Sequence, residues 1–298
     1  MDENYNLEYT FFYSSIPFLV IGLMGNVSII RIVYKLREMH TPTNYLLVSM
    51  AVSDAIAILL WPLQFYEFWK VVCKLAELIA VCILVSSFTM TVLAVERYHA
   101  ILKPLRNGLC LREDNVKKAI ACIWIASFLL CLPATFFKEW SETYETCIGP
   151  WTLYLNRGSK ACVILDVVIS FIQLAIIVYC YGSLIRGLYF ANTVCPDTGG
   201  ERSSEKKKLA ITFVLVTIGF FIGYTPTLVS YVIIPSGDEE IDVSFYSQLT
   251  AVVDFVFIVS LCFNPFIYAF HSTNFKEGFK QVILCRNPQR HDEVAQLS

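Results

Sequence analysis

Charged residues are scarce in this chain of 298 residues. Asp, Glu, Lys and Arg together make up 16% of the sequence, hydrophobic residues make up 56%, and the mean hydropathy is +0.58. A soluble globular domain carries roughly a quarter charged residues, because its surface must be solvated. The low charge therefore argues against a soluble domain and for a chain embedded in lipid.

Other features are also missing. The stretch before Phe11 contains no basic region and no small-residue cleavage site, so we expect no cleaved signal peptide. The chain shows no internal repeat, which argues against an ion-coupled transporter, because transporters are commonly built from repeated halves. No histidine is matched with a nucleophile, so we expect no enzyme. The histidines are His40, His99, His271 and His291.

Seven long apolar segments are present, each long enough to cross a hydrocarbon core of about 30 Å as a helix. They cover residues 11–34, 45–68, 74–95, 119–137, 161–188, 209–234 and 245–270. The sequence predicts an all-α membrane protein, with a seven-transmembrane helix bundle at residues 11–270. We expect a short extracellular tail at residues 1–10, a short amphipathic cytoplasmic helix after span seven at residues 271–285, and a short cytoplasmic tail at residues 286–298.

The basic residues are distributed unequally between the two sides of the predicted bundle. Five of the 23 fall on the side of the N-terminus, and the remaining 18 fall on the other side. The five are Lys70, Lys74, Lys138, Arg157 and Lys160. Because cytoplasmic loops carry the excess of Lys and Arg, we expect a multi-pass protein of the plasma membrane with an extracellular N-terminus and a cytoplasmic C-terminus.

Three of the eleven cysteines lie outside the apolar segments at positions that suggest a disulfide or a lipid attachment site. Cys73, before span three, and Cys147, after span four, both face the oxidising side and could form a disulfide. Cys285 follows span seven on the cytoplasmic side, where it is either a palmitate attachment site or a free thiol.

Carboxylates within the predicted spans are costly in hydrocarbon and point to function. Asp54 lies near the middle of span two, so it must face the bundle interior and be protonated, paired or bound to a cation. Asp166 and Asp254 lie in the outer parts of spans five and seven, and the outer parts of these spans contain no basic residue. Buried carboxylates in such a cavity favour a cationic partner.

The apolar run of span three ends in Glu96-Arg97-Tyr98, with Pro104 and Leu105 following within two turns. A charged pair at this depth can be a simple membrane anchor, because Arg extends its charge to the interface. The accompanying motifs on other spans make the anchor interpretation the weaker one.

The ordered set of motifs resembles the rhodopsin-like, class A G-protein-coupled receptors. It extends over essentially residues 11–285, and it is the order across the spans, rather than any single motif, that is specific. The set comprises Gly25-Asn26, Leu46-Leu47 through Asp54, Cys73, Glu96-Arg97-Tyr98 with Pro104-Leu105, Trp124, Cys147, Pro226, Asn264-Pro265-x-x-Tyr268, and Phe275 through Phe279.

The resemblance implies a receptor in which an outer ligand shifts a two-state equilibrium and span six swings outward about its proline. Heterotrimeric G protein is then the implied partner. The residues implied in G-protein coupling are Glu96, Arg97, Tyr98, Leu105, Tyr181 and Tyr268. The implied activation switch comprises Phe220, Tyr224, Pro226, Asn264 and Pro265.

The resemblance also implies a bound sodium ion, and otherwise no cofactor. The residues that would hold this ion are Asp54, Ser86, Ser260 and Asn264.

Several positions depart from the family pattern. Gln173 stands where span five usually has proline, and Tyr224, preceded by Gly223, stands where span six usually has tryptophan. Lys206 occupies the base of span six, where some relatives carry an acid that locks the arginine. We therefore predict that Arg97 is held at rest by Glu96 alone, and that basal signalling is appreciable.

The ligand class is constrained by exclusion. Span seven has no Lys for a retinal Schiff base, and Ile79 stands where aminergic receptors have an aspartate, so retinal is excluded and a monoamine is disfavoured. A basic peptide is favoured, with a small cationic molecule as the alternative. The predicted ligand-binding residues are Tyr66, Asp166, Tyr224, Thr227, Tyr231 and Asp254.

Two further alternatives stay open at this stage. Asp166 and Asp254 could instead bond to neighbours such as Tyr66, Tyr231 or Thr227 and touch no ligand. The chain could also be a constitutively active receptor, or a decoy that binds without signalling. The lipid bilayer is an expected partner, arrestin could engage Ser203 or Ser204, and no nucleic-acid partner is expected.

Overall fold

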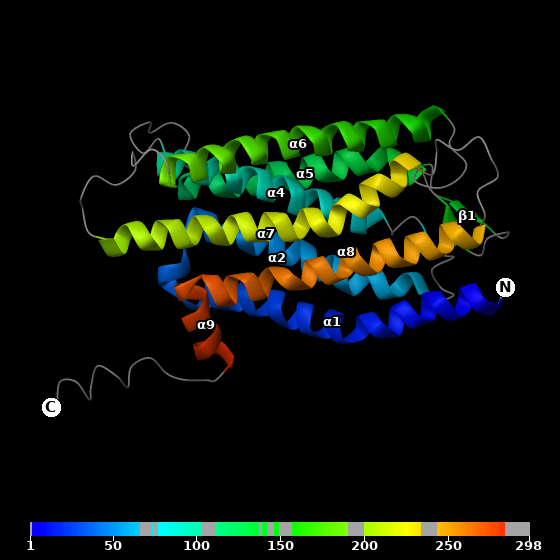
Figure 1. Cartoon of the computed structure of the whole chain (residues 1–298), viewed down its shortest axis with the longest axis horizontal. Coiled ribbons are helices and arrows are strands. Elements are labelled where there is room, and N and C mark those ends of the chain that lie inside the picture. Colours follow the sequence, from blue (N-terminus) through cyan, green and yellow to red (C-terminus); the bar gives the residue numbers. More distant parts are fainter. Residues whose placement is uncertain are drawn as a thin grey trace.

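The computed structural model describes residues 2–65, 73, 77–102, 111–136, 139–141, 146–148, 157–189, 200–233 and 243–283. Within these residues the chain forms an elongated bundle of roughly parallel and antiparallel helices (Figure 1). The long helices are α1 (Asp2–Lys35), α2 (Pro42–Leu60), α4 (Glu77–Leu102), α5 (Glu113–Phe136), α6 (Arg157–Tyr189), α7 (Gly200–Ile233) and α8 (Val243–His271).

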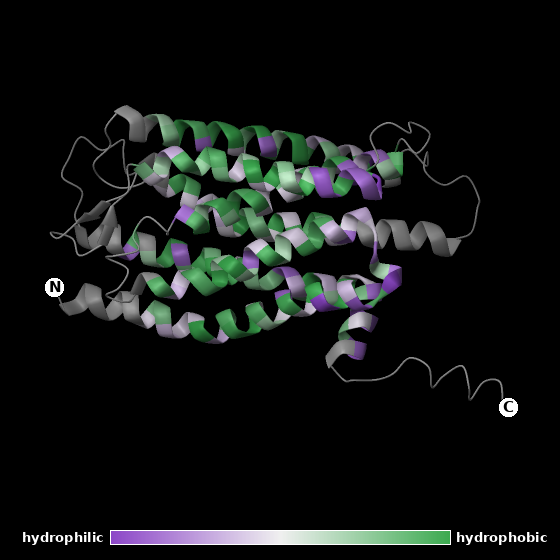
Figure 2. Cartoon of the chain, turned by 180° about the vertical axis from the view of Figure 1, so that it is seen from behind, coloured by the Kyte–Doolittle hydropathy of each residue, from purple (hydrophilic) through white to green (hydrophobic). Residues whose placement is uncertain are grey.

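The described part of the chain contains seven helices that are long and apolar enough to cross a membrane. They are the seven long helices above, and Figure 2 shows hydrophobic residues along the middle of the bundle, with hydrophilic residues gathering toward one end. The prediction of a seven-helix membrane bundle is confirmed. Its core is a continuous cluster of buried side chains such as Leu46, Val85, Ile258 and Tyr268.

The short elements mark the two ends of the bundle. One end carries a small hairpin of antiparallel strands, β1 (Glu139–Ser141) and β2 (Thr146–Ile148), in which Trp140 pairs with Cys147. The other end carries α9 (Thr273–Ile283), which leaves the bundle at a steep angle to α8 in Figure 1. We call these the hairpin end and the α9 end.

The amphipathic character of α9 agrees with the expectation from its sequence. Phe275 is buried, and its ring lies 5.6 Å from that of Tyr268, measured between centroids. Lys276, Glu277 and Lys280 are exposed. One face of α9 therefore packs on the bundle, and the other carries charge.

Several helix boundaries differ from the sequence prediction. α1 begins at Asp2, so the residues expected as a tail continue the first helix. α4 continues to Leu102, which places Glu96 and Arg97 inside a helix rather than at its exit. Charged residues late in a helix do not end it, because Glu and Arg have good helix propensity.

Two further differences concern turns. α2 ends at Leu60 and is followed by a 3₁₀ turn, Trp61–Phe65, because Pro62 cannot donate the hydrogen bond that would continue the helix. A second 3₁₀ turn, Arg37–Met39, joins α1 to α2. α7 begins at Gly200, within the expected loop, and contains Pro226, and Figure 1 shows it changing direction in its second half.

Close packing between α1 and α8 depends on small residues. A Cβ atom added at Gly25 would lie 2.7 Å from Pro265 Cβ, whereas one added at Gly182 in α6 would meet no atom within 4 Å. Small residues let helix backbones approach in a membrane, where packing rather than hydrophobic burial drives association.

Replacing Gly25 with Ala should therefore destabilise the protein, because α1 and α8 must separate to admit the methyl group. We expect a loss of about 1–3 kcal/mol, seen as a lower thermal unfolding midpoint of the purified protein in detergent. Gly182→Ala is the matched control, and its midpoint should equal or exceed that of the wild type, because Ala favours a helix more than Gly does. Equal midpoints for both variants would contradict the packing argument.

Candidate functional site

Arg97 lies in the last two turns of α4, near the α9 end. Its Nε lies 2.6 Å from Glu96 Oε2. Its Nη2 donates to the Thr43 hydroxyl at the start of α2, and that hydroxyl in turn donates to Glu96 Oε2 at 3.4 Å. Thr43 thus joins both members of the ion pair, so α2 and α4 are tied together.

The Arg97 side chain also reaches α7. Its Cζ lies 5.2 Å from the centroid of the Phe213 ring, a cation–π distance. The expectation that Glu96 alone holds Arg97 is therefore wrong, because a hydroxyl of α2 and an aromatic ring of α7 contribute as well. Neither Thr43 nor Phe213 carries a sequence signal for this role, since Thr43 lies in the first turn of α2 and Phe213 lies in an apolar stretch of α7.

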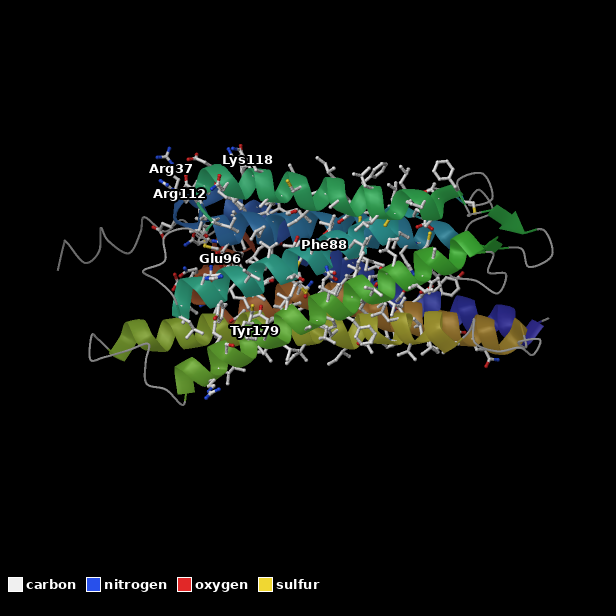
Figure 3. The ribbon with its side chains drawn as sticks, turned by 90° about the horizontal axis from the view of Figure 1, so that it is seen from above. Arg37, Phe88, Glu96, Arg112, Lys118 and Tyr179 are labelled. Atoms are coloured by element: carbon white, nitrogen blue, oxygen red, sulfur yellow. The ribbon has the colours of Figure 1, made fainter. Side chains whose placement is uncertain are left out.

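Basic side chains gather at the same end of the bundle. Figure 3 shows Arg37, Arg112 and Lys118 projecting beyond Glu96, which lies among the helices. Arg37 and Arg112 are exposed. Glu96 is buried, so its charge is balanced mainly by Arg97.

The tyrosines predicted at this end occupy separate positions. The Tyr98 ring lies 5.8 Å from that of Tyr179 in α6. Tyr181 is buried, and the Thr217 hydroxyl of α7 donates to its oxygen at 3.4 Å. Tyr268 is buried in α8, and its hydroxyl has no hydrogen-bond partner within the described residues. Leu105 lies outside the described residues.

Asp54 lies at the centre of the bundle, where three helices meet. Its two carboxylate oxygens accept hydrogen bonds from Ser86 of α4 at 2.8 Å and from Asn264 of α8 at 2.9 Å. Ser53 lies 2.8 Å from Ser86, between the two hydroxyl oxygens. Ser260 instead donates to the Phe257 carbonyl of its own helix.

Gln173, which replaces the usual proline of span five, has a structural partner. Its Oε1 accepts a hydrogen bond of 2.6 Å from Ser87, which joins α6 to α4. Both residues are buried. α6 is thus fixed at this point by a polar link between helices rather than shaped by a proline.

Tyr224, which replaces the usual tryptophan of span six, also has a partner. Its hydroxyl donates to Asp166 Oδ2 at 3.0 Å, which joins α7 to α6. The two residues line a small cavity of about 50 Å³, together with Ile83, Cys131 and Ile169. Phe220 lies one turn along α7, with its ring centroid 5.5 Å from that of Tyr224.

The remaining predicted residues are distributed as follows. Thr227 is buried, and its hydroxyl has no hydrogen-bond partner within the described residues, whereas Asp254 is partly exposed. Cys73 is buried and disulfide-bonded. The side chains of Cys147 and Tyr231 are not described, and Tyr66 and Cys285 lie outside the described residues, so their predicted roles stay predictions.

The chain is similar in sequence to a known receptor family and to several of its members. Residues 25–268 match the sequence model of a family described as 7 transmembrane receptor (rhodopsin family). Somatostatin receptor type 5 of Bos taurus is 27% identical over 280 residues, covering 89% of this chain and 74% of the relative. Somatostatin receptor type 2 of Mus musculus is 25% identical over 299 residues, covering 95% of this chain and 78% of the relative. Allatostatin-A receptor of Bombyx mori is 25% identical over 302 residues, covering 90% of this chain and 78% of the relative.

The contacts of Thr43 lead to a stability prediction. Thr43→Val keeps the shape of the side chain but removes the hydroxyl that joins Glu96 and Arg97. We expect a loss of about 1–3 kcal/mol and a lower unfolding midpoint in detergent. The same substitution at exposed Thr225 of α7 should leave the midpoint unchanged. If Thr43→Val and Thr225→Val have the same unfolding midpoint, Thr43 does not hold the ion pair.

Proposed function

The chain belongs to the rhodopsin family of seven-transmembrane receptors, and we propose that it transmits an extracellular ligand signal to a heterotrimeric G protein. The observation that carries this proposal is the arrangement around Arg97. Three helices contribute to holding one cation near the α9 end, through Glu96, Thr43 and Phe213. Such an arrangement can exist in two states, held and released.

We take the held state as the resting one. Outward movement of α7 at the α9 end would carry the Phe213 ring away from the guanidinium, and the kink at Pro226 provides the hinge. Arg97 would then offer five N–H donors to backbone carbonyls of a G-protein segment entering between the helices. Tyr181 and Tyr268, buried on α6 and α8, would line the opened space.

The proposed orientation follows from the positions of the basic residues. The excess of Lys and Arg at the α9 end predicts that this end faces the cytoplasm, with the hairpin end outside the cell. This orientation at the plasma membrane places Arg97 where a G protein can reach it and Asp166 where an extracellular ligand can.

A basic peptide is the proposed ligand, and a small cationic molecule is the second candidate. The relatives are receptors for somatostatin and for allatostatin-A, which supports a peptide. Asp166 supports a cation, because it is only partly buried and Tyr224, which donates a hydrogen bond to it, carries no positive charge.

A sodium ion is a further proposal, and the residues around Asp54 fit it in part. The Asp54 carboxylate and the hydroxyls of Ser53 and Ser86 offer oxygens within one buried cluster. The Asn26 side-chain oxygen is buried without a hydrogen-bond partner in the described residues. Ser260 fits less well, because its hydroxyl bonds to its own helix. The ion would supply the positive charge that balances Asp54.

Arg97→Ala should abolish G-protein activation without reducing surface expression, because the guanidinium meets the G protein directly, whereas its resting contacts are a small part of the packing between α2, α4 and α7. Because the contact of Arg97 on α7 is an aromatic ring rather than an acid, we still expect unliganded wild-type receptor in proteoliposomes to stimulate nucleotide exchange above receptor-free liposomes, on at least one member of a panel of G-protein classes. Arg97→Ala should return exchange to background, and exposed Arg112→Ala should not.

Two results would contradict this proposal. Wild-type exchange equal to background would reject basal signalling, and exchange by Arg97→Ala equal to wild type would reject the role of Arg97. Solute flux in the same liposomes would favour a transporter, and ligand binding with no exchange in any class would favour a decoy receptor.

Asp254→Asn tests the charge of the ligand separately. Agonist potency for a basic peptide found by screening should fall at least about tenfold, because the ionic contact between the Asp254 carboxylate and a cationic group of the peptide is lost. Asp114→Asn, at an exposed position of α5, is the matched control and should leave potency unchanged. Unchanged potency for Asp254→Asn would reject the ionic contact at that residue.

A further inference from the structure

An open groove lies between α6 and α7 on the outer surface of the bundle, where the helices face lipid. Its volume is about 680 Å³, which falls among the volumes of ligand sites, roughly 300–1,000 Å³. Exposed aliphatic side chains line it, among them Val178 of α6 and Ile218 and Ile222 of α7. A Cβ atom added at Gly182 would meet no atom within 4 Å, so the groove is open there. It is separate from the small cavity that Asp166 lines.

Few polar side chains line the groove, and two of them are already engaged. The Thr217 hydroxyl donates to the Phe213 carbonyl at 2.8 Å and lies 3.4 Å from the Tyr181 oxygen. Thr217 and Tyr181 are buried, and exposed Thr225 is the other polar side chain of the lining. An unmatched polar group costs free energy in hydrocarbon. A molecule that fills this groove should therefore be apolar along its length.

The groove extends over the half of the membrane at the α9 end. Leu174 lies at the middle of the apolar span Ala161–Gly187 of α6, and the lining of the groove on α6 runs from Leu174 to Gly182. Arg186 follows one turn later, about 18 Å from Leu174 along the helix axis. One leaflet contributes about half of a hydrocarbon core of about 30 Å. The groove therefore leads from the middle of the bilayer toward the head-group layer, which Arg186 reaches.

Arg186 provides a positive charge at this end of the groove. It lies in the last turn of α6 and is exposed. Among the residues that the structure describes, it forms no ion pair. Arg186 and Gly182 are four residues apart, so they are neighbours on one face of the helix. Because Gly182 has no side chain, that position places nothing between the guanidinium and the groove.

We propose that the groove and Arg186 together bind an anionic phospholipid of the leaflet at the α9 end. One acyl chain fills the groove, and the phosphate pairs with the Arg186 guanidinium, whose planar donors match phosphate oxygens. The groove accepts an apolar chain and offers a cation at one end, which is the pattern of an amphiphile with a negative head group. This inference goes beyond the proposed function and does not depend on it.

Three other occupants are distinguishable from this one. A sterol has an uncharged hydroxyl as its polar group, so it would leave Arg186 without a counter-charge. A free phosphate ion would pair with Arg186 but leave the groove unfilled. Ordinary bilayer lipid would touch the groove no more strongly than any other exposed apolar face, and it would not select for head-group charge.

The experiment uses the full chain in phosphatidylcholine nanodiscs, without ligand or G protein. The probe is phosphatidic acid with a photoreactive diazirine at the middle of one acyl chain, and phosphatidylcholine with the same labelled chain is the comparison. After irradiation, mass spectrometry locates the adducts. Adducts on residues 125–129 of α5, where Ile125, Phe128 and Leu129 are exposed, measure ordinary lipid contact.

Adducts on residues 174–182 and 214–226, relative to those on residues 125–129, should be at least about fivefold more abundant with phosphatidic acid, because its phosphate has no choline to neutralise it. Arg186→Gln should reduce this ratio to the phosphatidylcholine value. Arg112→Gln, at an exposed position of the same end, is the matched control and should leave it unchanged. Gly182→Leu should lower labelling of the groove by both lipids, because its side chain occupies the open space.

Equal labelling of the groove by the two lipids would overturn the proposal in favour of ordinary lipid contact, as would an unchanged ratio in Arg186→Gln. Unlabelled phosphatidic acid should displace the probe, whereas cholesterol and glycerol phosphate should not. Displacement by cholesterol but not by phosphatidic acid would identify a sterol site, and displacement by glycerol phosphate would identify a phosphate site without the groove. Either result would also overturn the proposal.

Discussion

A polar group inside a bilayer must find its partner within the protein, and this constraint organises the bundle. Asp54 accepts from Asn264, although 210 residues separate them, and Arg97 donates to Thr43 across 54 residues. Each such bond is formed only when both helices have one particular rotation about their axes. Apolar contacts alone specify this rotation weakly. Because every partner comes from a different helix, moving one helix releases groups that then need new partners. Under the proposed function, the groups released in this way are the ones that meet new partners in the active receptor.

The two residues that break the family pattern illustrate this constraint. Gln173 and Tyr224 replace a proline and a tryptophan, and each forms a hydrogen bond to a neighbouring helix, with Ser87 and Asp166 respectively. α6 is thus linked to α4 at one level and to α7 at another. Asp166, which we propose as a ligand contact, accepts a hydrogen bond from the helix that carries Pro226.

The sequence predicted the seven spans, the amphipathic α9 and the family, because hydrophobic runs and ordered motifs depend on the chain alone. It did not predict Thr43 and Phe213 as contacts of Arg97, because these contacts depend on how α2 and α7 are rotated about their axes. It also missed the hairpin of β1 and β2, whose three-residue strands are too short to show an alternating pattern. Asp166 was predicted to bind a ligand, but its bond to Tyr224 depends on helix rotation in the same way.

The central claim is that Arg97 is held in the resting bundle and released when a G protein binds. The most direct test is the separation between Arg97 Cζ and the Phe213 ring, which is 5.2 Å here, in an experimental structure of the receptor bound to nucleotide-free G protein. The account predicts that Phe213 has moved away with α7, that the contact with Glu96 is broken, and that Arg97 faces the G protein. A complex in which Arg97 still lies over Phe213 and beside Glu96 would contradict it.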